Sequence, residues 1–405
     1  MMRVLLLLAL LTVEACKRAD VVRADPTPPV DASVPLKPVI PTLMALHGRI
    51  VDVTTGEVKF PLRSKLPLDE VNDARNAYVL DDDGMLRAWE LSTGKPLWSL
   101  STAARALVPD EANLYLLDTS DLRLVNMTTG VAKTFISRTL PAEEVRPFGG
   151  GFAVRRGLTV EVYAGLSTAA YPKSTLERFM EDYRVALVAA GSNVCFVDLK
   201  PPEFELHCID TSAKETVHAV VAAPAGVGRV SPILATQHHA VIGTYSFGSK
   251  SARAAVVIRL RDGKEVARLG DEIVALVESP AGDLEGLIAV GEEVRFYEPT
   301  GALRWKYKPK WAESFAKVLA RDNTLVFAMH NIIATGVEVF ALRKSDGREL
   351  WIGETKLPPI GHSKYHNRVT LESRGDAAIL RGHESSVEHV HVYDLRTGAL
   401  RYHDP

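Results

Sequence analysis

The chain has 405 residues, with 48 Lys and Arg against 50 Asp and Glu, which leaves a formal net charge of −2. Hydrophobic residues make up 46% and charged residues 24%, so the composition is that of a globular protein and excludes wholesale disorder. The near-neutral charge argues against a protein that binds nucleic acid. Three cysteines are too few for a disulfide scaffold or a four-cysteine zinc site.

The first sixteen residues have the features of an export signal. Arg3 precedes an apolar run over residues 4–13, which is too short to span a bilayer because a spanning helix needs about 20 residues. The sequence VEAC that ends at Cys16 resembles a bacterial lipobox, which implies a signal peptide over residues 1–15 and lipidation of Cys16. Glu14 departs from the usual pattern, and the alternative is an ordinary signal peptide with an incidental cysteine.

A lipidated Cys16 would be followed directly by Lys17. In bacterial lipoproteins this resemblance implies the outer membrane, on the side facing the periplasm, and the inner membrane is the alternative. Residues 16–43 then form a linker that is rich in proline and free of aromatic residues. Such a segment cannot bury enough apolar surface to offset the entropy of ordering, so we expect a disordered N-terminal tether.

The remaining residues carry a recurring pattern of strands and turns. Its clearest copy spans residues 77–98, where alternating apolar residues are interrupted by turns at Gly84 and Gly94. Alternation of this kind, with Gly and Asp at the turns, predicts antiparallel hairpins. We interpret the three aspartates at residues 81–83 as part of a turn and not as a calcium loop, because they lack the spacing of an EF-hand.

A turn glycine recurs before a short final strand, and an aromatic residue often follows it by four positions. Glycine supplies the positive φ that a hairpin turn needs, and the aromatic residue is expected to pack against the next unit. The pairs are Gly56 and Phe60, Gly94 and Trp98, Gly301 and Trp305, Gly347 and Trp351, and Gly398 and Tyr402.

The spacing of these turns predicts an all-β fold, a β-propeller over residues 44–405. If eight turns lie between Gly94 and Gly398, their spacing averages about 43 residues, the size of one four-stranded blade. We therefore predict eight four-stranded blades, with seven as the alternative. The hairpin at residues 48–62 has no room for two preceding strands, so we interpret it as an extra hairpin or as a contribution to ring closure. Residues 174–189 are interpreted as a loop insertion that leads into a strand.

Four segments carry a family resemblance. Residues 78–98 (YVLDDDGMLRAWELSTGKPLW), 294–305 (VRFYEPTGALRW), 337–351 (VEVFALRKSDGRELW) and 390–402 (VHVYDLRTGALRY) resemble the quinoprotein-type, or PQQ-like, propeller repeat. A lipid-anchored chain of this length with such a propeller is similar to the B lipoproteins of the outer-membrane β-barrel assembly machinery. The WD-type repeat is the competing family, on the strength of the sequence RGH at residues 381–383.

No motif for catalysis or cofactor binding occurs in the sequence. Quinone-dependent alcohol dehydrogenases with this repeat carry two adjacent cysteines beside the cofactor, whereas Cys195 and Cys208 are not adjacent. A Gly-rich phosphate loop, a Gly-x-Ser-x-Gly motif and a His-Glu-x-x-His motif are all missing from the sequence. We therefore predict no catalytic residue, no cofactor and no enzymatic activity.

His389 and His391 are weak candidates for metal ligands. They lie two residues apart, so on a strand they share one face, and imidazole pairs with this spacing can hold a divalent metal. The interpretation that we favour is that both are exposed side chains on an outer blade and that no metal is bound.

The two remaining cysteines lie on a predicted hairpin. If the strands over residues 193–199 and 204–210 pair symmetrically, Cys195 lies directly opposite Cys208. Opposed positions bring the Cβ atoms to about 4.5–5.5 Å, and a disulfide needs about 3.8 Å. Because an exported protein meets an oxidising environment, a cross-strand disulfide is one hypothesis. Two small buried side chains with no bond between them are the other.

These features favour a non-catalytic, membrane-anchored scaffold that binds other proteins in the bacterial cell envelope. The resemblance implies a role in outer-membrane protein assembly, with the assembly machinery as partner. A candidate contact surface is the segment WKYKPKW at residues 305–311, and an ordinary connection between blades is the alternative. Two other classes of function remain open. One is a quinone- or sugar-binding enzyme with a site in the central channel, and the other is a surface sensor or adhesion module.

Overall fold

The computed structural model describes the chain from residue 42 to residue 404, with gaps. The described ranges are 42–62, 67–110, 112–118, 121–137, 144–149, 151–156, 159–163, 174–175, 187–200, 203–210, 214–222, 229–230, 233–245, 253–310, 315–330, 337–353, 368–384 and 387–404. These residues belong to one compact unit, Ile40–Pro405. The predicted signal peptide, Cys16 and nearly all of the linker lie outside them. In the described ranges no helix has the length and apolar character needed to cross a membrane.

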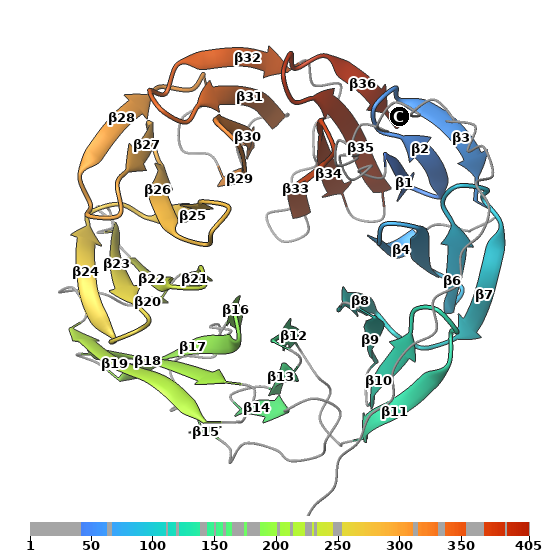
Figure 1. Ribbon diagram of the computed structural model, residues 1–405, viewed down its shortest axis with the longest axis horizontal. Coiled ribbons are helices and arrows are strands. Elements are labelled where there is room, and N and C mark those ends of the chain that lie inside the picture. Colours follow the sequence, from blue (N-terminus) through green and yellow to red (C-terminus); the bar gives the residue numbers. More distant parts are fainter. Residues whose placement is uncertain are drawn as a thin grey trace, which may run out of the picture. The chain divides into compact units, whose positions relative to one another are not determined.

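The described strands form antiparallel sheets that follow one another around a ring, which Figure 1 shows in chain order. We number these sheets as blades 1 to 9. Blade 1 contains β1 (Leu43–Leu46), β2 (Arg49–Asp52) and β3 (Glu57–Pro61). Blade 2 contains β4 (Pro67–Asn72), β5 (Asn76–Asp81), β6 (Met85–Glu90) and β7 (Pro96–Ser101). Blade 3 contains β8 (Ala106–Pro109), β9 (Asn113–Leu117), β10 (Asp121–Asn126) and β11 (Ala132–Ser137).

Blades 4 to 6 lie in the middle of the chain. Blade 4 contains β12 (Glu144–Phe148), β13 (Gly151–Arg156), β14 (Thr159–Tyr163) and β15 (Ser174–Thr175). Blade 5 contains β16 (Val188–Ala190), β17 (Asn193–Lys200), β18 (Glu203–Asp210) and β19 (Glu215–Ala222). Blade 6 contains β20 (Arg229–Val230), β21 (Leu234–Ala235), β22 (His239–Tyr245), β23 (Arg253–Arg259) and β24 (Lys264–Leu269).

The last three blades each contain four strands. Blade 7 contains β25 (Ile273–Glu278), β26 (Leu284–Val290), β27 (Val294–Tyr297) and β28 (Leu303–Tyr307). Blade 8 contains β29 (Phe315–Arg321), β30 (Thr324–His330), β31 (Val337–Arg343) and β32 (Glu349–Gly353). Blade 9 contains β33 (Arg368–Arg374), β34 (Ala377–Glu384), β35 (Val387–Asp394) and β36 (Leu400–His403).

The blade count corrects the predicted eight, and the alternative of seven, to nine in the described part of the chain. The error concerns the hairpin at residues 48–62. That segment belongs to a separate three-stranded sheet, β1-β2-β3, which occupies its own place in the ring between blades 9 and 2. The described residues give this sheet three strands, so its short pattern does not resemble a complete four-stranded repeat. The insertion predicted over residues 174–189 leads into β16, and most of it lies outside the described residues.

The core consists of nine buried clusters, and each one joins two neighbouring blades of the described ring. The strand β31 shows how the sequence produces this packing. Val339 and Ala341 point toward blade 9, whereas Phe340 and Leu342 point toward blade 7, because successive side chains of a strand face opposite sides. A strand of this kind is apolar at consecutive positions because both of its faces are buried.

The turn glycines and the outer-strand aromatic residues meet across the junctions between blades. A Cβ atom at Gly347, in blade 8, would lie 2.6 Å from the indole of Trp305 in blade 7. The φ of Gly347 is 71°, a value that favours glycine for a second reason. The same contact joins Phe60 to Gly94, Trp98 to Gly130 and Trp351 to Gly398. Tyr402 is buried in the cluster between blades 9 and 1.

Candidate functional site

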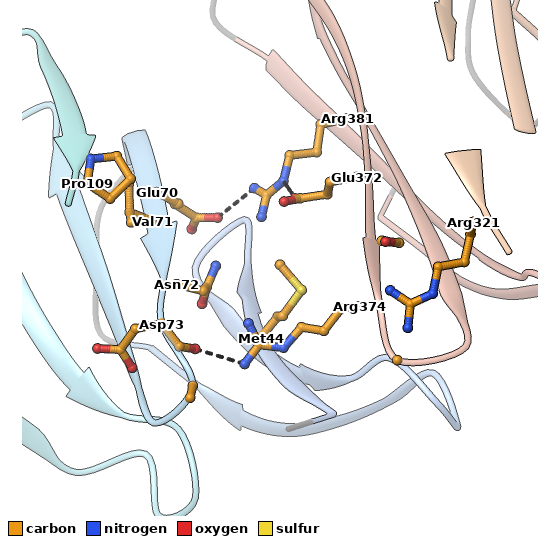
Figure 2. A pocket seen from close by; sticks show the side chains of 13 residues that line it. Met44, Glu70, Val71, Asn72, Asp73, Pro109, Arg321, Glu372, Arg374 and Arg381 are labelled. Carbon is orange, nitrogen blue, oxygen red and sulfur yellow. Dashed lines mark hydrogen bonds and ion pairs between the residues drawn. The ribbon is translucent and has the colours of Figure 1, made fainter. Parts of the chain in front are cut away.

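A cavity of about 630 Å³ opens among the innermost strands where the ring closes (Figure 2). Its walls come from β1, β4, β8, β29, β33 and β34, so segments from both ends of the described chain share one site. The lining residues are Met44, Glu70, Val71, Asn72, Asp73, Ala74, Pro109, Arg321, Glu372, Ser373, Arg374, Gly375 and Arg381.

A buried ion pair holds one wall of this cavity in place. Arg381 Nη1 lies 3.1 Å from Glu70 Oε2, and Arg381 Nε lies 3.1 Å from Glu372 Oε1. The Glu70 carboxylate also accepts hydrogen bonds from the backbone N–H groups of His47 and Gly48, at 3.0 and 2.9 Å. Only 2% of the Glu70 side chain is exposed, so these donors replace the water that the charge has lost. Blades 9, 1 and 2 are joined through this one carboxylate.

Two further arginines line the cavity beside the carboxylates of Asp73 and Glu372. Arg374 Nη2 donates a hydrogen bond to the carbonyl oxygen of Asp73 at 2.9 Å, and burial lowers the pKa of this guanidinium. Arg321 is exposed at the end of β29 and forms no ion pair with another residue of the described ranges. A guanidinium with unused donors suits a carboxylate or phosphate oxygen. Arg321 therefore gives the cavity a group that can bind an acidic ligand, and among the described lining residues no nucleophile is paired with a base.

The outer rim is the second candidate surface. The last strand of each blade has a hydrogen-bonded neighbour on one side only within its described sheet, and in Figure 1 these strands form the periphery of the ring. Most of the exposed large apolar side chains lie on or next to these outer strands. They are Val58, Leu97, Val131, Val220, Leu303, Leu350 and Ile352. Unpaired strand edges with apolar side chains are the features that accept a strand from another protein.

The structure joins Cys195 and Cys208 in a disulfide. Strands β17 and β18 pair in the register expected from their symmetric arrangement, so the two cysteines are directly opposed. Both side chains are fully buried in the cluster between blades 5 and 6. The bond is part of the core and is not exposed to a partner.

The interpretation of His389 and His391 as exposed side chains is wrong. Both lie on β35, and their exposed fractions are 6% and 1%. The strand is the third of blade 9 and pairs with β36, where His403 lies opposite His391 with the ring centroids 6.1 Å apart. Both histidines share the face of Tyr393, which packs in the cluster between blades 8 and 9. The pair does not belong to any group of three close metal-ligand side chains in the described ranges.

For the candidate contact surface at residues 305–311, the structure supports the alternative, an ordinary connection between blades. Trp305 is buried and covers Gly347, and Tyr307 donates a hydrogen bond to Glu349 Oε2 at 2.6 Å. Both aromatic residues therefore serve the junction between blades 7 and 8. Trp311 lies outside the described residues, as does the lipidation site at Cys16.

Sequence reasoning missed a cluster of Glu205, His207 and His218 in blade 5. One ligand atom from each side chain lies within 4.8 Å of the other two, as in a metal site. The first two residues lie on β18, and His218 lies opposite His207 on β19. Their contact depends on the register between β18 and β19, which a bulge after Cys208 shifts by one residue, so a symmetric hairpin would not have brought the two histidines together.

The comparisons with known proteins agree with the ring. No protein-family model matches the chain, and no curated protein sequence matches it. The solved structure of BamB from Moraxella catarrhalis is similar with a TM-score of 0.57 and 12% identity, over 80% of this chain and 96% of that chain. The computationally designed Ika8 protein has a TM-score of 0.52 and 11% identity, over 80% of this chain and 95% of that one.

An enzyme is also among the similar structures. The dihydro-heme d1 dehydrogenase NirN has a TM-score of 0.50 and 14% identity, over 78% of this chain and 72% of that chain. At such identities these likenesses show the fold alone. The chain has the fold of a β-propeller, and a fold of this kind carries both binding proteins and enzymes.

Proposed function

We propose that the chain is a non-catalytic, membrane-anchored scaffold that binds other proteins in the bacterial cell envelope. The observation that carries this proposal is the outer rim, where strands that are hydrogen-bonded on one side only within their described sheets present exposed apolar side chains. On β32, Leu350 and Ile352 are 40% and 57% exposed and point away from Trp351, which faces the core. A partner strand added along this edge would gain backbone hydrogen bonds and cover both side chains.

The location in the envelope is proposed from the first part of the sequence. The apolar run of residues 4–13 and the cysteine at position 16 support export and lipidation, and the proline-rich residues 16–43 would hold the propeller away from the membrane. Lys17 after the cysteine supports the outer membrane, on the side facing the periplasm.

A role in outer-membrane protein assembly is the finer part of the proposal. It is supported by the resemblance of the repeat and the lipobox to the B lipoproteins of the β-barrel assembly machinery, and by the likeness of the fold to BamB. Under this proposal the partner is a component of that machinery, and the propeller supplies a rigid surface for it.

Affinity purification of the tagged, full-length protein after cross-linking in cells tests the proposal. We expect an envelope protein to be recovered with the wild-type chain and to be depleted when Leu350 and Ile352 are both replaced by Lys. The matched control is Lys264→Glu on the outer strand β24, a strand with no exposed large apolar side chain in the described ranges. Recovery of no envelope protein, or equal recovery with all three chains, would overturn the proposal.

The cavity supports a second candidate, a propeller that binds a small ligand. Its volume lies in the range of known ligand sites, and Arg321 offers unused donors to a quinone carboxylate or an acidic sugar. This candidate predicts dye-linked dehydrogenase activity or saturable binding of such a compound, with loss of either in Arg321→Ala. Protease treatment of intact cells separates both candidates from a surface sensor or adhesion module, because only a surface protein would be cleaved.

A further inference from the structure

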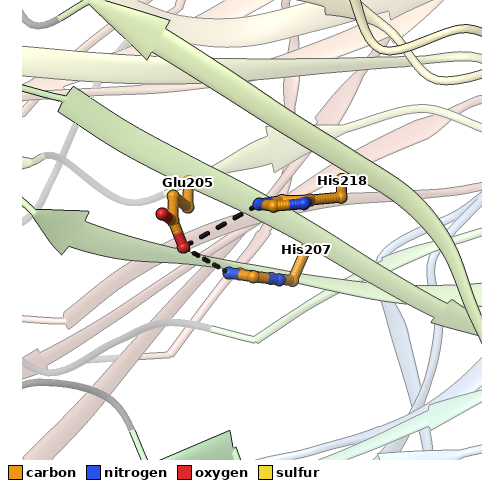
Figure 3. Close-up of side chains that lie close together, drawn as sticks. All are labelled: Glu205, His207 and His218. Atoms are coloured by element: carbon orange, nitrogen blue, oxygen red, sulfur yellow. Dashed lines mark ion pairs between the residues drawn. The ribbon is translucent and has the colours of Figure 1, made fainter.

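Three side chains with metal-binding chemistry converge on one face of blade 5 (Figure 3). Glu205 and His207 lie two residues apart on β18 and therefore share a face, and the register places His218 of β19 directly beside His207. Glu205 Oε2 lies 3.5 Å from His207 Nε2 and 3.8 Å from His218 Nε2. The alternating residues Leu206 and Cys208 point to the opposite face, into the core.

A fourth residue fixes the orientation of the central histidine. His207 Nδ1 lies 2.6 Å from Glu215 Oε1. An ionised carboxylate only accepts hydrogen bonds, so Nδ1 carries the proton and Nε2 keeps its lone pair, on the side of the ring where Glu205 lies. Histidine ligands of metals have this arrangement, with a carboxylate on the nitrogen that does not bind the ion.

The neighbours of His207 restrict its ring further. Phe196 on β17 stacks against it with ring centroids 5.3 Å apart, and His218 stacks on it with centroids 4.9 Å apart. The side chain of His207 is 19% exposed, whereas that of His218 is 48% exposed. One imidazole is therefore held in place and the other has room to turn toward an ion.

The distances are close to those of a zinc site. Tetrahedral Zn²⁺ has bonds of about 2.0–2.2 Å to histidine nitrogen and carboxylate oxygen, which separates neighbouring ligand atoms by about 3.4 Å. The two contacts of Glu205 Oε2 are within a few tenths of an ångström of that value. The ligand nitrogens of His207 and His218 lie within 4.8 Å of each other, and this distance shortens toward about 3.4 Å if the exposed His218 ring tilts.

We propose that Glu205, His207 and His218 form a binding site for one Zn²⁺ ion, with Glu215 as the residue that positions His207. Two imidazoles and one carboxylate favour a late transition metal over Ca²⁺ or Mg²⁺, which prefer a full set of oxygen ligands. Three protein ligands leave one position for water or for a side chain from another protein.

A metal at this place would fasten the outer strand of its blade. The disulfide between Cys195 and Cys208 already joins β17 to β18 on the core face. The zinc site would join β18 to β19 on the opposite face. The outer strand β19 has no further hydrogen-bonded neighbour within its described sheet, so the ion would stabilise the strand that is least held by backbone pairing.

Calorimetric titration of the metal-stripped, full-length protein with ZnCl₂ tests this proposal. We expect one equivalent to bind and the melting temperature to rise with Zn²⁺, because an ion that binds only the folded state stabilises it. His218→Ala and Glu205→Gln should each weaken binding at least about tenfold, and Glu215→Gln should weaken it by about 10–100-fold through the position of His207. The visible spectrum of the Co²⁺ form should show tetrahedral coordination in the wild type and lose it in His218→Ala.

The control is His403→Ala, which removes an exposed histidine on β36 of blade 9 and leaves blade 5 unchanged. It should bind Zn²⁺ as the wild type does. His218 is exposed, so its variant is expected to keep the metal-free melting temperature, which separates loss of the site from loss of the fold. Absence of stoichiometric binding in the wild type, or equal affinity in wild type and His218→Ala, would overturn the proposal.

Discussion

The indole nitrogen of Trp305 donates a hydrogen bond to the carbonyl oxygen of Lys344 at 2.8 Å, three residues before the glycine that the same ring covers. The relation recurs around the ring. Trp98 donates to the carbonyl of Met127 at 3.0 Å, and Trp351 donates to that of Leu395 at 2.9 Å, each three residues before a turn glycine. One aromatic residue thus supplies both apolar contact and a polar bond to the next blade, and the glycine allows the close approach.

Substitution of Gly347 should show the importance of this contact. Gly347→Ala introduces a Cβ at 2.6 Å from Trp305 and a side chain at positive φ. We expect a loss of about 2–4 kcal/mol in the free energy of unfolding, as the sum of overpacking and the left-handed conformation. Urea unfolding followed by tryptophan fluorescence measures this loss.

Gly375→Ala is the matched control for this substitution. Its φ is 62°, but a Cβ there would meet no atom within 4 Å, so it should lose only about 1–2 kcal/mol. Trp305→Phe should keep the ring over the glycine and lose the bond to Lys344, at a cost of about 1 kcal/mol. Equal losses in Gly347→Ala and Gly375→Ala would contradict the role of the contact.

The disulfide makes a separate prediction about blade 5. The double substitution of Cys195 and Cys208 by Ala should lower the free energy of unfolding by about 3 kcal/mol, because the bond restricts the unfolded chain. Reductant should destabilise the wild type by a similar amount and leave the variant unchanged. Alkylation of the denatured, non-reduced protein and mass spectrometry should find neither thiol free. Modification of both cysteines would contradict the bond.

The ion pair at the ring closure should matter more than ion pairs on the surface. Glu70→Gln removes a buried carboxylate from the buried guanidinium of Arg381, and we expect a loss of about 3 kcal/mol. The control is Glu293→Gln, which removes surface ion pairs with Lys306 and Arg295 and should change stability by less than about 1 kcal/mol. Thermal unfolding of both variants gives the comparison. A Glu70 variant as stable as its control would show that the carboxylate does not hold the blades together.

The sequence pattern predicted those structural features that depend on residues close together in the chain, namely the turns and the strands beside them. The turn at Gly94 and the strands that flank it follow from alternation and from the glycine itself, so the all-β fold and the four-stranded unit could be read directly. The blade count could not, because the strand β1 has no repeat signature and takes its place by pairing with β2 and by packing on blades 9 and 2.

The cavity was beyond sequence reasoning for the same physical reason. Glu70 of blade 2 and Arg381 of blade 9 are 311 residues apart in the sequence and meet where the ring closes, beside blade 1. No local spacing in the sequence predicts this contact. The histidines of blade 5 are an intermediate case. His207 and His218 lie on neighbouring strands, so their contact follows from the hairpin register once the bulge after Cys208 is known.

The buried carboxylate of Asp69 should make stability depend on pH in an unusual direction. Asp69 Oδ2 accepts a hydrogen bond from the backbone N–H of Leu107 at 2.8 Å, which joins the inner strands of blades 2 and 3. Burial raises the pKa of this carboxyl above its ordinary value, and the bond from Leu107 opposes the shift without cancelling it. The folded state therefore holds the proton more tightly than the unfolded state.

The sign of the effect follows from that difference. The contribution of Asp69 to stability is largest below its unfolded pKa of about 3.9 and is lost as the pH rises from there through the folded pKa. Asp69→Asn keeps an oxygen acceptor for Leu107 and buries no charge. We therefore expect the stability of Asp69→Asn relative to the wild type to increase as the pH rises from about 3.9 through the folded pKa of Asp69.

Asp69→Ala separates the charge from the hydrogen bond. It leaves the N–H of Leu107 without this acceptor, so it should be about 1–3 kcal/mol less stable than Asp69→Asn. Because neither variant titrates at this position, the difference between them should stay constant with pH. Urea unfolding of the three proteins across the pH range measures both quantities. A relative stability of Asp69→Asn that falls with rising pH would show that the hydrogen bond from Leu107 outweighs burial and that the folded state prefers the charged carboxylate.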